Sequence, residues 1–173
     1  MTYEEGKQKF VQTWGTLGST WGINRTMAQI HALLLISPRP LCGDEIMEEL
    51  QISRGNANMN IRALVDWGLV RKEIIAGDRR DFYSAEKDTY RVMLQIMKER
   101  RRRELAPVVG ALDELRAAPL ERSAGESEAE AEEFTKMVHA LSDFTQKADQ
   151  MLEMMIRRDE HWFYGKLMKM LIK

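Results

Sequence analysis

The side chains best suited to contact another molecule are gathered in one stretch, from Ser53 to Arg62. On a helix, at 100° per residue, Ile61 and Leu64 fall within about 40° of Ala57, and the three residues predict a buried face. Asparagine can pair with adenine through two hydrogen bonds, and arginine with guanine or phosphate. The outward face is therefore predicted to recognise bases in a major groove. Its candidate residues are Ser53, Arg54, Gly55, Asn56, Asn58, Met59 and Arg62.

The members of this face have different expected roles. Asn56 and Arg62 are predicted to face the groove. Arg54 and Asn58 flank them near the helix N-terminus, where unpaired N–H groups also favour phosphate. Asparagine is a weak helix former, so asparagines at alternate positions are not what a purely structural helix would use. Ser53 is explained equally well as the residue that caps the helix.

A second basic feature is the short turn Gly77–Arg80, which is predicted to carry the guanidinium groups of Arg79 and Arg80 at the tip of a hairpin. Such a tip can follow the phosphate backbone or enter a minor groove. The alternative is an ordinary solvated turn.

The elements around these residues form a recognisable order. Helices are expected at residues 43–50 and 53–67, with a break at 51–53, and strands at 69–75 and 81–85. Two helices followed by a hairpin with a basic tip is the layout of a winged helix-turn-helix. This layout brings the two candidate contact features into one small domain.

Further helices flank this segment on both sides. An amphipathic helix is expected at residues 3–17, loosened at its end by Gly15, Gly18 and Gly22, and a buried helix at 24–36 ends at Pro38 and Pro40. More helix is expected at 88–118 and at 134–158. The predicted fold is mainly α, a winged helix-turn-helix with a small antiparallel β hairpin and additional N- and C-terminal helices.

Four consecutive arginines, Arg100–Arg103, lie inside the helix expected after the hairpin. Consecutive helical residues point in different directions, so they do not form one patch. The favoured interpretation is a solvated stretch with ion pairs to Glu99 and Glu104. The alternative is a phosphate contact beside the hairpin.

Composition excludes several classes of protein. The 173 residues include 26 Lys+Arg and 27 Asp+Glu, a net charge of −1, so any nucleic-acid binding must use locally clustered charge. The longest apolar run, Ala32–Ile36, is far shorter than the roughly 20 residues that span a bilayer. With one cysteine and an acidic N-terminus, a cytoplasmic protein that does not bind membranes is expected.

No catalytic or metal-binding motif is present in the sequence. His31, His139 and His161 lie far apart, so neither an enzyme nor a metal or other cofactor is expected. His31 is predicted to be a hydrogen-bonded core residue rather than a ligand. Cys42 is predicted to pack in the core, with a redox-sensing thiolate as the alternative.

Taken together, these motifs resemble the GbsR-like branch of the MarR superfamily of bacterial and archaeal repressors. The resemblance spans about Trp14 to Arg103 and is carried by an ordered series of segments: Trp21–Arg25, Leu35–Pro38, Ile52–Arg62, Trp67–Val70 and Gly77–Tyr83. It implies a homodimer in which two winged domains read a palindromic DNA operator. The implied division is an N-terminal dimerisation helix at 1–20, a DNA-binding domain at 21–87 and a C-terminal dimerisation region at 88–173.

The predicted function is that of a sequence-specific DNA-binding transcriptional regulator, with repressor as the favoured type. The alternative is a winged-helix module that binds another protein instead of DNA. The resemblance also implies a small-molecule effector, and some relatives sense choline-type compounds. Phe10, Trp14 and Trp21 are the candidate effector site, because aromatic faces attract quaternary ammonium groups; the alternative is that these rings pack the junction between helices.

Overall fold

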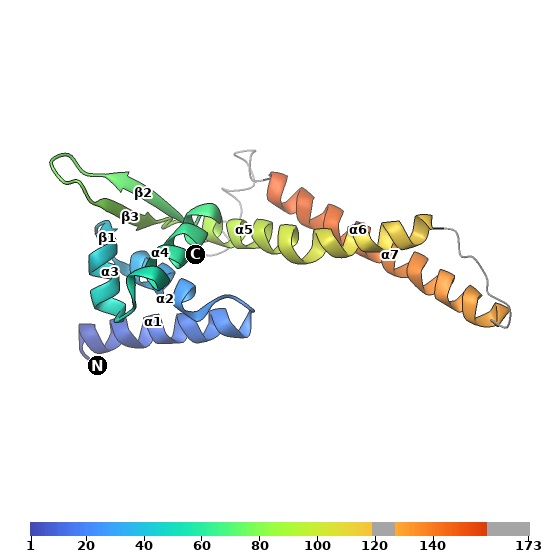
Figure 1. The fold of residues 1–173 in the computed structure, drawn as a ribbon, viewed down its shortest axis with the longest axis horizontal. Coiled ribbons are helices and arrows are strands. Elements are labelled where there is room, and N and C mark those ends of the chain that lie inside the picture. Colours follow the sequence, from blue (N-terminus) through green and yellow to red (C-terminus); the bar gives the residue numbers. More distant parts are fainter. Residues whose placement is uncertain (119–126, 159–173) are drawn as a thin grey trace. The chain divides into compact units, whose positions relative to one another are not determined.

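The structure, a computed structural model, describes residues 1–118 and 127–158, which divide into two compact units, Met1–Gln95 and Ile96–Lys173. The elements of the first, here the winged unit, are labelled in Figure 1. They are α1 (Tyr3–Thr20), α2 (Arg25–Ile36), β1 (Leu41–Cys42), α3 (Gly43–Leu50), α4 (Arg54–Asp66), β2 (Val70–Ile74), β3 (Asp81–Ala85) and the first turns of α5 (Thr89–Arg100). The predicted mainly helical fold with a winged helix-turn-helix is confirmed.

The first helix is longer and more firmly packed than expected. Helix α1 continues to Thr20, and Gly15 and Gly18 are buried against α2. A Cβ atom on Gly18 would stand 2.5 Å from the Cβ of Ala28, and one on Gly15 would stand 2.6 Å from a side-chain carbon of Gln29. The prediction that these glycines loosen the helix end is wrong, because they allow two helices to approach closely.

The sheet has three strands rather than the two of the predicted hairpin. Its order is β1-β3-β2, all antiparallel, with Cys42 opposite Phe82 and Val70 opposite Ala85. Strand β1 has two residues, too few for any periodic pattern to predict it. It ties the start of α3 to the hairpin of β2 and β3, called the wing below.

The core of the winged unit is built mainly by its helices. The largest fully buried side chains include Ile30 and Leu34 of α2, Ile46 of α3 and Leu64 of α4. This core explains the spacing of apolar residues in the sequence, since α3 and α4 each turn one apolar face inward and α2 is buried on most sides.

The second unit contains the end of α5, a π-helical turn η1 (Arg101–Leu105), α6 (Ala106–Ala117) and α7 (Glu128–Arg158). The predicted continuous helix at 88–118 is therefore interrupted at η1. Pro107 lacks an N–H for the Arg103 carbonyl and its ring crowds that carbonyl, which favours a widened turn just before it. The final helix begins at Glu128 and includes the predicted helical region 134–158; residues 159–173 of the predicted C-terminal region lie outside the described residues.

Helices α6 and α7 are joined along their length by polar contacts. Ser142 is fully buried, and its hydroxyl donates to Asp113 Oδ1 at 2.9 Å. Gln146 Nε2 donates to the same carboxylate oxygen at 2.7 Å. Because a buried hydroxyl left unpaired is costly, these bonds fix the register of the two helices.

Candidate nucleic-acid interface

Helix α4 is positioned by its cap and its buried face. The Ser53 hydroxyl accepts a hydrogen bond from the Asn56 backbone N–H at 3.3 Å, so the capping role of Ser53 is observed. Ala57, Ile61 and Leu64 are buried, as predicted. The exposed surface of the helix carries five of the predicted contact residues: Arg54, Gly55, Asn58, Met59 and Arg62.

The expected outward orientation of Asn56 is corrected. Its side chain is half-buried, and its Oδ1 accepts a hydrogen bond from Asn60 Nδ2 at 2.7 Å. Its Nδ2 lies 3.4 Å from the hydroxyl of Thr26 on α2. Asn56 is one residue from Ala57, about 100° around the helix, and so lies at the flank of the buried face rather than opposite it.

Asn60 explains why the helix contains several asparagines. It is only 3% exposed, and its Nδ2 also donates to the Asn56 backbone carbonyl at 2.8 Å. A buried amide needs such partners. Two of the three asparagines thus serve packing between α4 and α2, and Asn58 is the one that remains exposed.

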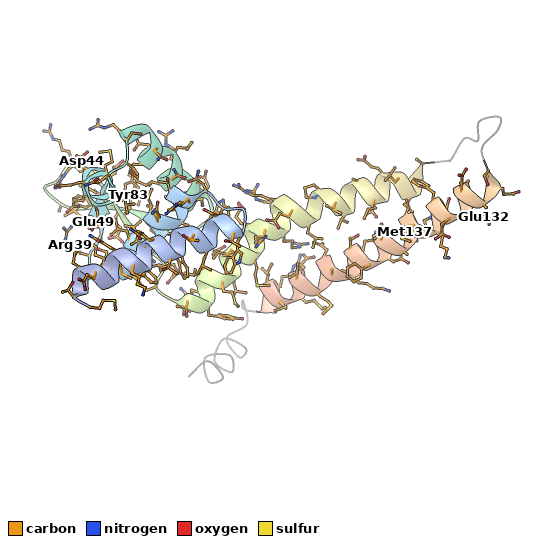
Figure 2. All side chains as sticks on the ribbon, turned by 90° about the horizontal axis from the view of Figure 1, so that it is seen from below. Arg39, Asp44, Glu49, Tyr83, Glu132 and Met137 are labelled. Atoms are coloured by element: carbon orange, nitrogen blue, oxygen red, sulfur yellow. The ribbon has the colours of Figure 1, made fainter. Side chains whose placement is uncertain are left out.

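A hollow of about 250 Å³ lies where α3, α4 and the wing meet. Figure 2 labels Asp44 and Tyr83, which both line it. Arg54 is 3.6 Å from Asp44 across its mouth, and both side chains are well exposed, so this ion pair contributes little. The complete lining is Cys42, Gly43, Asp44, Met47, Arg54, Asn58, Arg80, Asp81 and Tyr83. The hollow brings the N-terminal end of α4 and the first half of β3 to one face.

The wing does not project two guanidinium groups as predicted. Arg80 turns back onto Asp78, with Nη2 2.6 Å from Oδ2, and lies over the Phe82 ring at 5.3 Å. Hydrogen bonds from Arg80 lower the pKa of Asp78 to about 2 and the same contact raises the pKa of Arg80. Arg79 is exposed and makes no ion pair within the described part of the chain, so it alone extends from the tip.

Other charges on the wing are also paired. Lys72 on β2 is 2.8 Å from Asp81 on β3, and the hydrogen bond between them raises the pKa of Lys72. Burial is the main cause that raises the pKa of Tyr83, and Arg62 acts in the opposite direction. Asn58 of α4 and Tyr83 of the wing both line the hollow, so the two elements meet at one surface.

Cys42 and His31 are both core residues. Cys42 is 1% exposed and Arg80 Nη1 lies 3.5 Å from its Sγ, which agrees with the packing interpretation. His31 is 3% exposed, but its Nε2 has no hydrogen-bond partner, so the expected bond is not seen at that atom. Burial, with a smaller contribution from Lys87, lowers the pKa of His31 to about 4.

The four arginines after the wing are all engaged by carboxylates. Arg101 Nε donates to Asp149 at 2.6 Å on α7, and Arg100 donates to Glu104 at 3.1 Å. Arg102 and Arg103 both pair with Glu99, which is 6% exposed. The ion-paired interpretation is confirmed, although Glu99 is buried rather than solvated.

The three residues of the candidate effector site are not brought together as a cage. Phe10 and Trp14 stack at 5.6 Å with an interplanar angle of 27°, and Trp14 lies 6.3 Å from His31. Trp21 is 52% exposed at the end of α1 and makes no ring contact with residues that the structure describes. The structure therefore offers a two-ring stack, with Trp21 separate from it.

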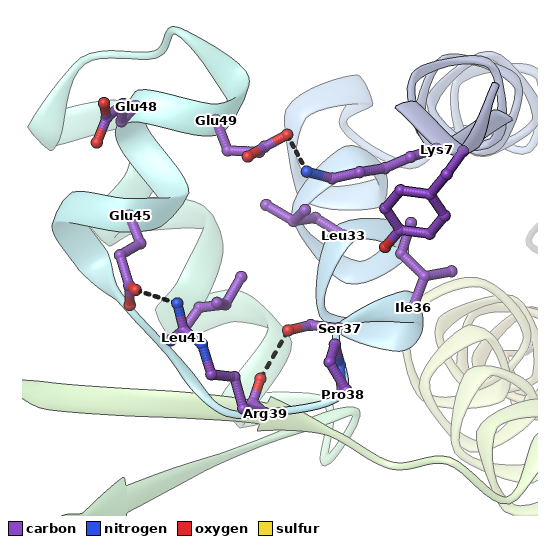
Figure 3. A pocket seen from close by; sticks show the side chains of 11 residues that line it. Lys7, Leu33, Ile36, Ser37, Pro38, Arg39, Leu41, Glu45, Glu48 and Glu49 are labelled. Atoms are coloured by element: carbon purple, nitrogen blue, oxygen red, sulfur yellow. Dashed lines mark hydrogen bonds and ion pairs between the residues drawn. The ribbon is translucent and has the colours of Figure 1, made fainter. Parts of the chain in front are cut away.

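A larger cavity, of about 590 Å³, lies elsewhere on the winged unit, between α1, the end of α2 and α3 (Figure 3). Its lining includes the apolar residues Leu33, Ile36 and Leu41 and the ion pairs Lys7–Glu49 and Arg39–Glu45. Sequence reasoning missed this cavity, because its walls come from elements whose packing no local pattern reveals.

Two negative observations complete the site. In residues 1–118 and 127–158 no group of three or more His, Cys, Asp or Glu side chains is placed to hold a metal ion. None of the helices in these ranges is long and apolar enough to cross a membrane. His161 lies outside the described residues.

The fold and the exposed face define a winged helix-turn-helix protein. Residues 21–81 match the MarR family, and the resemblance to its GbsR-like branch is confirmed.

Among known proteins, the HTH-type transcriptional repressor GbsR of Bacillus subtilis (strain 168) is 27% identical over 97 residues. The match covers 56% of this chain and 53% of GbsR, so it spans about half the length of that relative.

A solved structure shows the same fold. The crystal structure of a transcriptional regulator has a TM-score of 0.65 and 18% identity, and the match covers 90% of this chain and 98% of that one. A mutant of S. aureus MepR bound to an oligodeoxyribonucleotide has a TM-score of 0.40 and 16% identity over 80% of this chain and 91% of that one.

Proposed function

We propose that this protein is a sequence-specific DNA-binding transcriptional repressor that acts as a homodimer on a palindromic operator. The observation that carries the proposal is the shared face of α4 and the wing, where Arg54, Asn58 and Arg62 are exposed and Arg79 extends from the hairpin tip. In a winged helix-turn-helix the second helix enters the major groove. Asn58 and Arg62 would then reach base edges, and Arg79 a phosphate or the adjacent minor groove.

The chemistry of this face favours DNA over a partner protein. The exposed residues of α4 are polar or charged apart from Gly55, Met59, which is 60% exposed, and Val65, which is 38% exposed; the wing adds the exposed Ile74 and Ile75. A surface that binds another protein usually has a contiguous apolar centre. The two scattered apolar side chains of α4 do not supply one on that helix.

Helix α7 supports the homodimer. Its large exposed apolar residues recur three and four positions apart along one side of the helix, while Val138 and the fully buried Ser142 lie on the side that packs against α6. A seam with this period packs best against another helix. We assign a second copy of this chain to it, because doubling the winged unit doubles the DNA half-sites that can be read. The seam residues are Phe134, Met137, Leu141, Phe144, Met151 and Met155.

A binding assay that varies salt tests the DNA interface. DNA fragments selected from a random duplex pool are titrated with the protein at several salt concentrations. Affinity for the selected fragment should exceed affinity for random duplex by at least about a thousandfold and fall steeply with salt. Equal, weak binding to both DNAs would favour the protein-binding module instead.

The proposal includes an effector that changes the spacing of the two winged units. Choline-type cations are the expected class, and the stacked rings of Phe10 and Trp14 offer aromatic faces to such a cation. Choline or glycine betaine should then quench tryptophan fluorescence and weaken operator binding. Trp14→Ala should abolish both responses, and Trp21→Ala serves as the matched control. The absence of both responses at millimolar ligand would contradict this part of the proposal.

A further inference from the structure

Three consecutive residues, Glu86, Lys87 and Asp88, connect β3 to α5, and each contacts a different element of the winged unit. The Glu86 backbone N–H donates to the carbonyl of Leu69, which immediately precedes β2, at 3.0 Å. The Asp88 carboxylate accepts from the backbone N–H of Tyr90 at 3.1 Å and so caps the start of α5. Lys87 reaches the end of α2.

The Lys87 contact is unusually complete. Its Nζ donates to the backbone carbonyls of Leu34 at 2.7 Å, Leu35 at 2.7 Å and Ser37 at 2.8 Å. The last carbonyls of a helix have no partner within the helix, and the helix dipole places partial negative charge there. One ammonium group therefore uses all three of its hydrogens on the C-terminal end of α2.

The junction is stiffened by its own hydrogen bonds. The Glu86 carboxylate accepts from the backbone N–H of Lys87 at 2.9 Å and of Asp88 at 3.0 Å. Further along, α5 lies against the turn before β2, because a Cβ atom on Gly68 would stand 3.3 Å from Gln95 Nε2. The first turns of α5 thus have contacts on two sides, with the Lys87 ammonium as the tie to α2.

We propose that Lys87 is a positioning residue for operator binding: by tying the start of α5 to the end of α2, it fixes the direction in which α5 leaves the winged unit. The inference rests on the proposed dimer. Two winged units can discriminate the separation of two half-sites only if each is held rigidly to the helix that leads away from it. Loss of the tie should leave each winged unit folded and able to bind a half-site, but free to accept other separations.

The variant Lys87→Met removes the ammonium and keeps most of the side-chain volume. Lys98→Met is the matched control, because Lys98 is an exposed lysine of α5 that makes no ion pair in the described ranges. Both are compared with the parent on a selected operator and on operators with one or two base pairs inserted between the half-sites. Each inserted pair rotates one half-site by about a tenth of a turn.

The parent and Lys98→Met should lose at least about tenfold in affinity on the lengthened operators. Lys87→Met should lose less than about threefold, with unchanged affinity and salt slope on a single half-site. A general loss of folding would lower affinity for every DNA alike. The ratio of affinity on the selected operator to affinity on the lengthened operators therefore distinguishes a positioning role from an effect on stability. Unchanged spacing discrimination in Lys87→Met overturns the proposal.

Two further variants keep the test decisive if Lys87→Met does not fold. Lys87→Arg keeps the charge, but no single nitrogen of the planar guanidinium carries three hydrogens. It cannot donate from one atom to all three carbonyls, so spacing discrimination should still fall. Lys87→Ala should regain discrimination when n-propylammonium is added, since this ion replaces the missing atoms. Full discrimination in Lys87→Arg, or no rescue of Lys87→Ala, contradicts the inference. A parent protein that binds no DNA specifically would contradict the proposed function instead.

Discussion

At the scale of single residues, the two arginines of the wing have different tasks although they are adjacent. Arg80 is held by Asp78 and lies over Phe82, whereas Arg79 is exposed. The sequence predicted a basic tip but not this division. Asp78 and Arg80 are two residues apart, and the sequence does not show whether their side chains form an ion pair. The turn geometry around Gly77, with φ +86°, determines whether they do.

This division predicts different effects of two alanine substitutions. Arg79→Ala should lower affinity for any DNA and reduce the slope of log affinity against log salt by about one phosphate contact. Arg80→Ala should change the slope less and instead lower the melting temperature, because Asp78 loses its partner. Fluorescence anisotropy at four salt concentrations measures the slopes. A full phosphate lost from the slope in Arg80→Ala alone would reverse the assignment.

His31 makes stability depend on pH. Burial lowers its pKa to about 4, below its ordinary value of 6.5, so between these values the unfolded chain binds a proton that the folded chain does not. Stability is therefore lost as the pH falls from about 6.5 to about 4, by on the order of 3 kcal/mol. The carboxylates with lowered pKa values, such as Asp78, stabilise the fold at these pH values and lose that contribution only at lower pH, from about 3.8 to about 2 for Asp78. Urea unfolding at pH 7 and pH 5 tests this; His31→Leu should remove most of the difference, and an equal pH dependence in that variant would refute it.

At the scale of elements, the sequence predicted those with strong local signals. The bounds of α3 and β3 agree with the predicted helix at 43–50 and strand at 81–85, since caps, apolar spacing and a clear turn mark them. Strand β1 and the turn η1 were missed. The first depends on pairing with β3 and the second on Pro107 within a helix, so neither has a local pattern of its own.

The candidate face was predicted in composition but not in orientation. Arg54, Asn58, Met59 and Arg62 are exposed as expected. Asn56 turns toward Thr26 on α2, a residue far away in the sequence. A helical wheel gives an angle around one helix, but it does not show which neighbouring helix lies at that angle.

The packing of α1 on α2 gives a prediction at this scale. Gly18→Ala places a methyl group where only 2.5 Å separates it from the Ala28 Cβ, so the helices must move apart. Overpacking of this kind costs about 1–3 kcal/mol, more than the roughly 1 kcal/mol by which alanine improves a helix. Gly6→Ala, where the nearest atom is a flexible methionine end at 3.7 Å, is the control and should be neutral or stabilising. Urea unfolding compares the two, and equal stability would contradict close packing at Gly18.

At the scale of the whole molecule, the apolar seam of α7 predicts the assembly. Phe144 is 71% exposed in the single chain, so the fold should tolerate a glutamate at this position. The charge should oppose pairing with a second copy. Phe144→Glu should be monomeric in sedimentation at micromolar concentration and lose operator affinity by at least about a hundredfold. Lys136→Glu, an exposed change on the same helix, should remain a dimer. A dimeric Phe144→Glu protein would remove the second copy from this seam.

The central claim is that the exposed face of α4 reads base sequence. The most direct measurement compares affinity for a selected operator with affinity for random duplex of equal length, at one salt concentration, for the parent and for Asn58→Ala and Arg62→Ala. Each variant should lose about 1–3 kcal/mol on the operator and much less on random duplex, so that the specificity ratio falls. If both variants keep the parent's ratio, α4 does not read the operator.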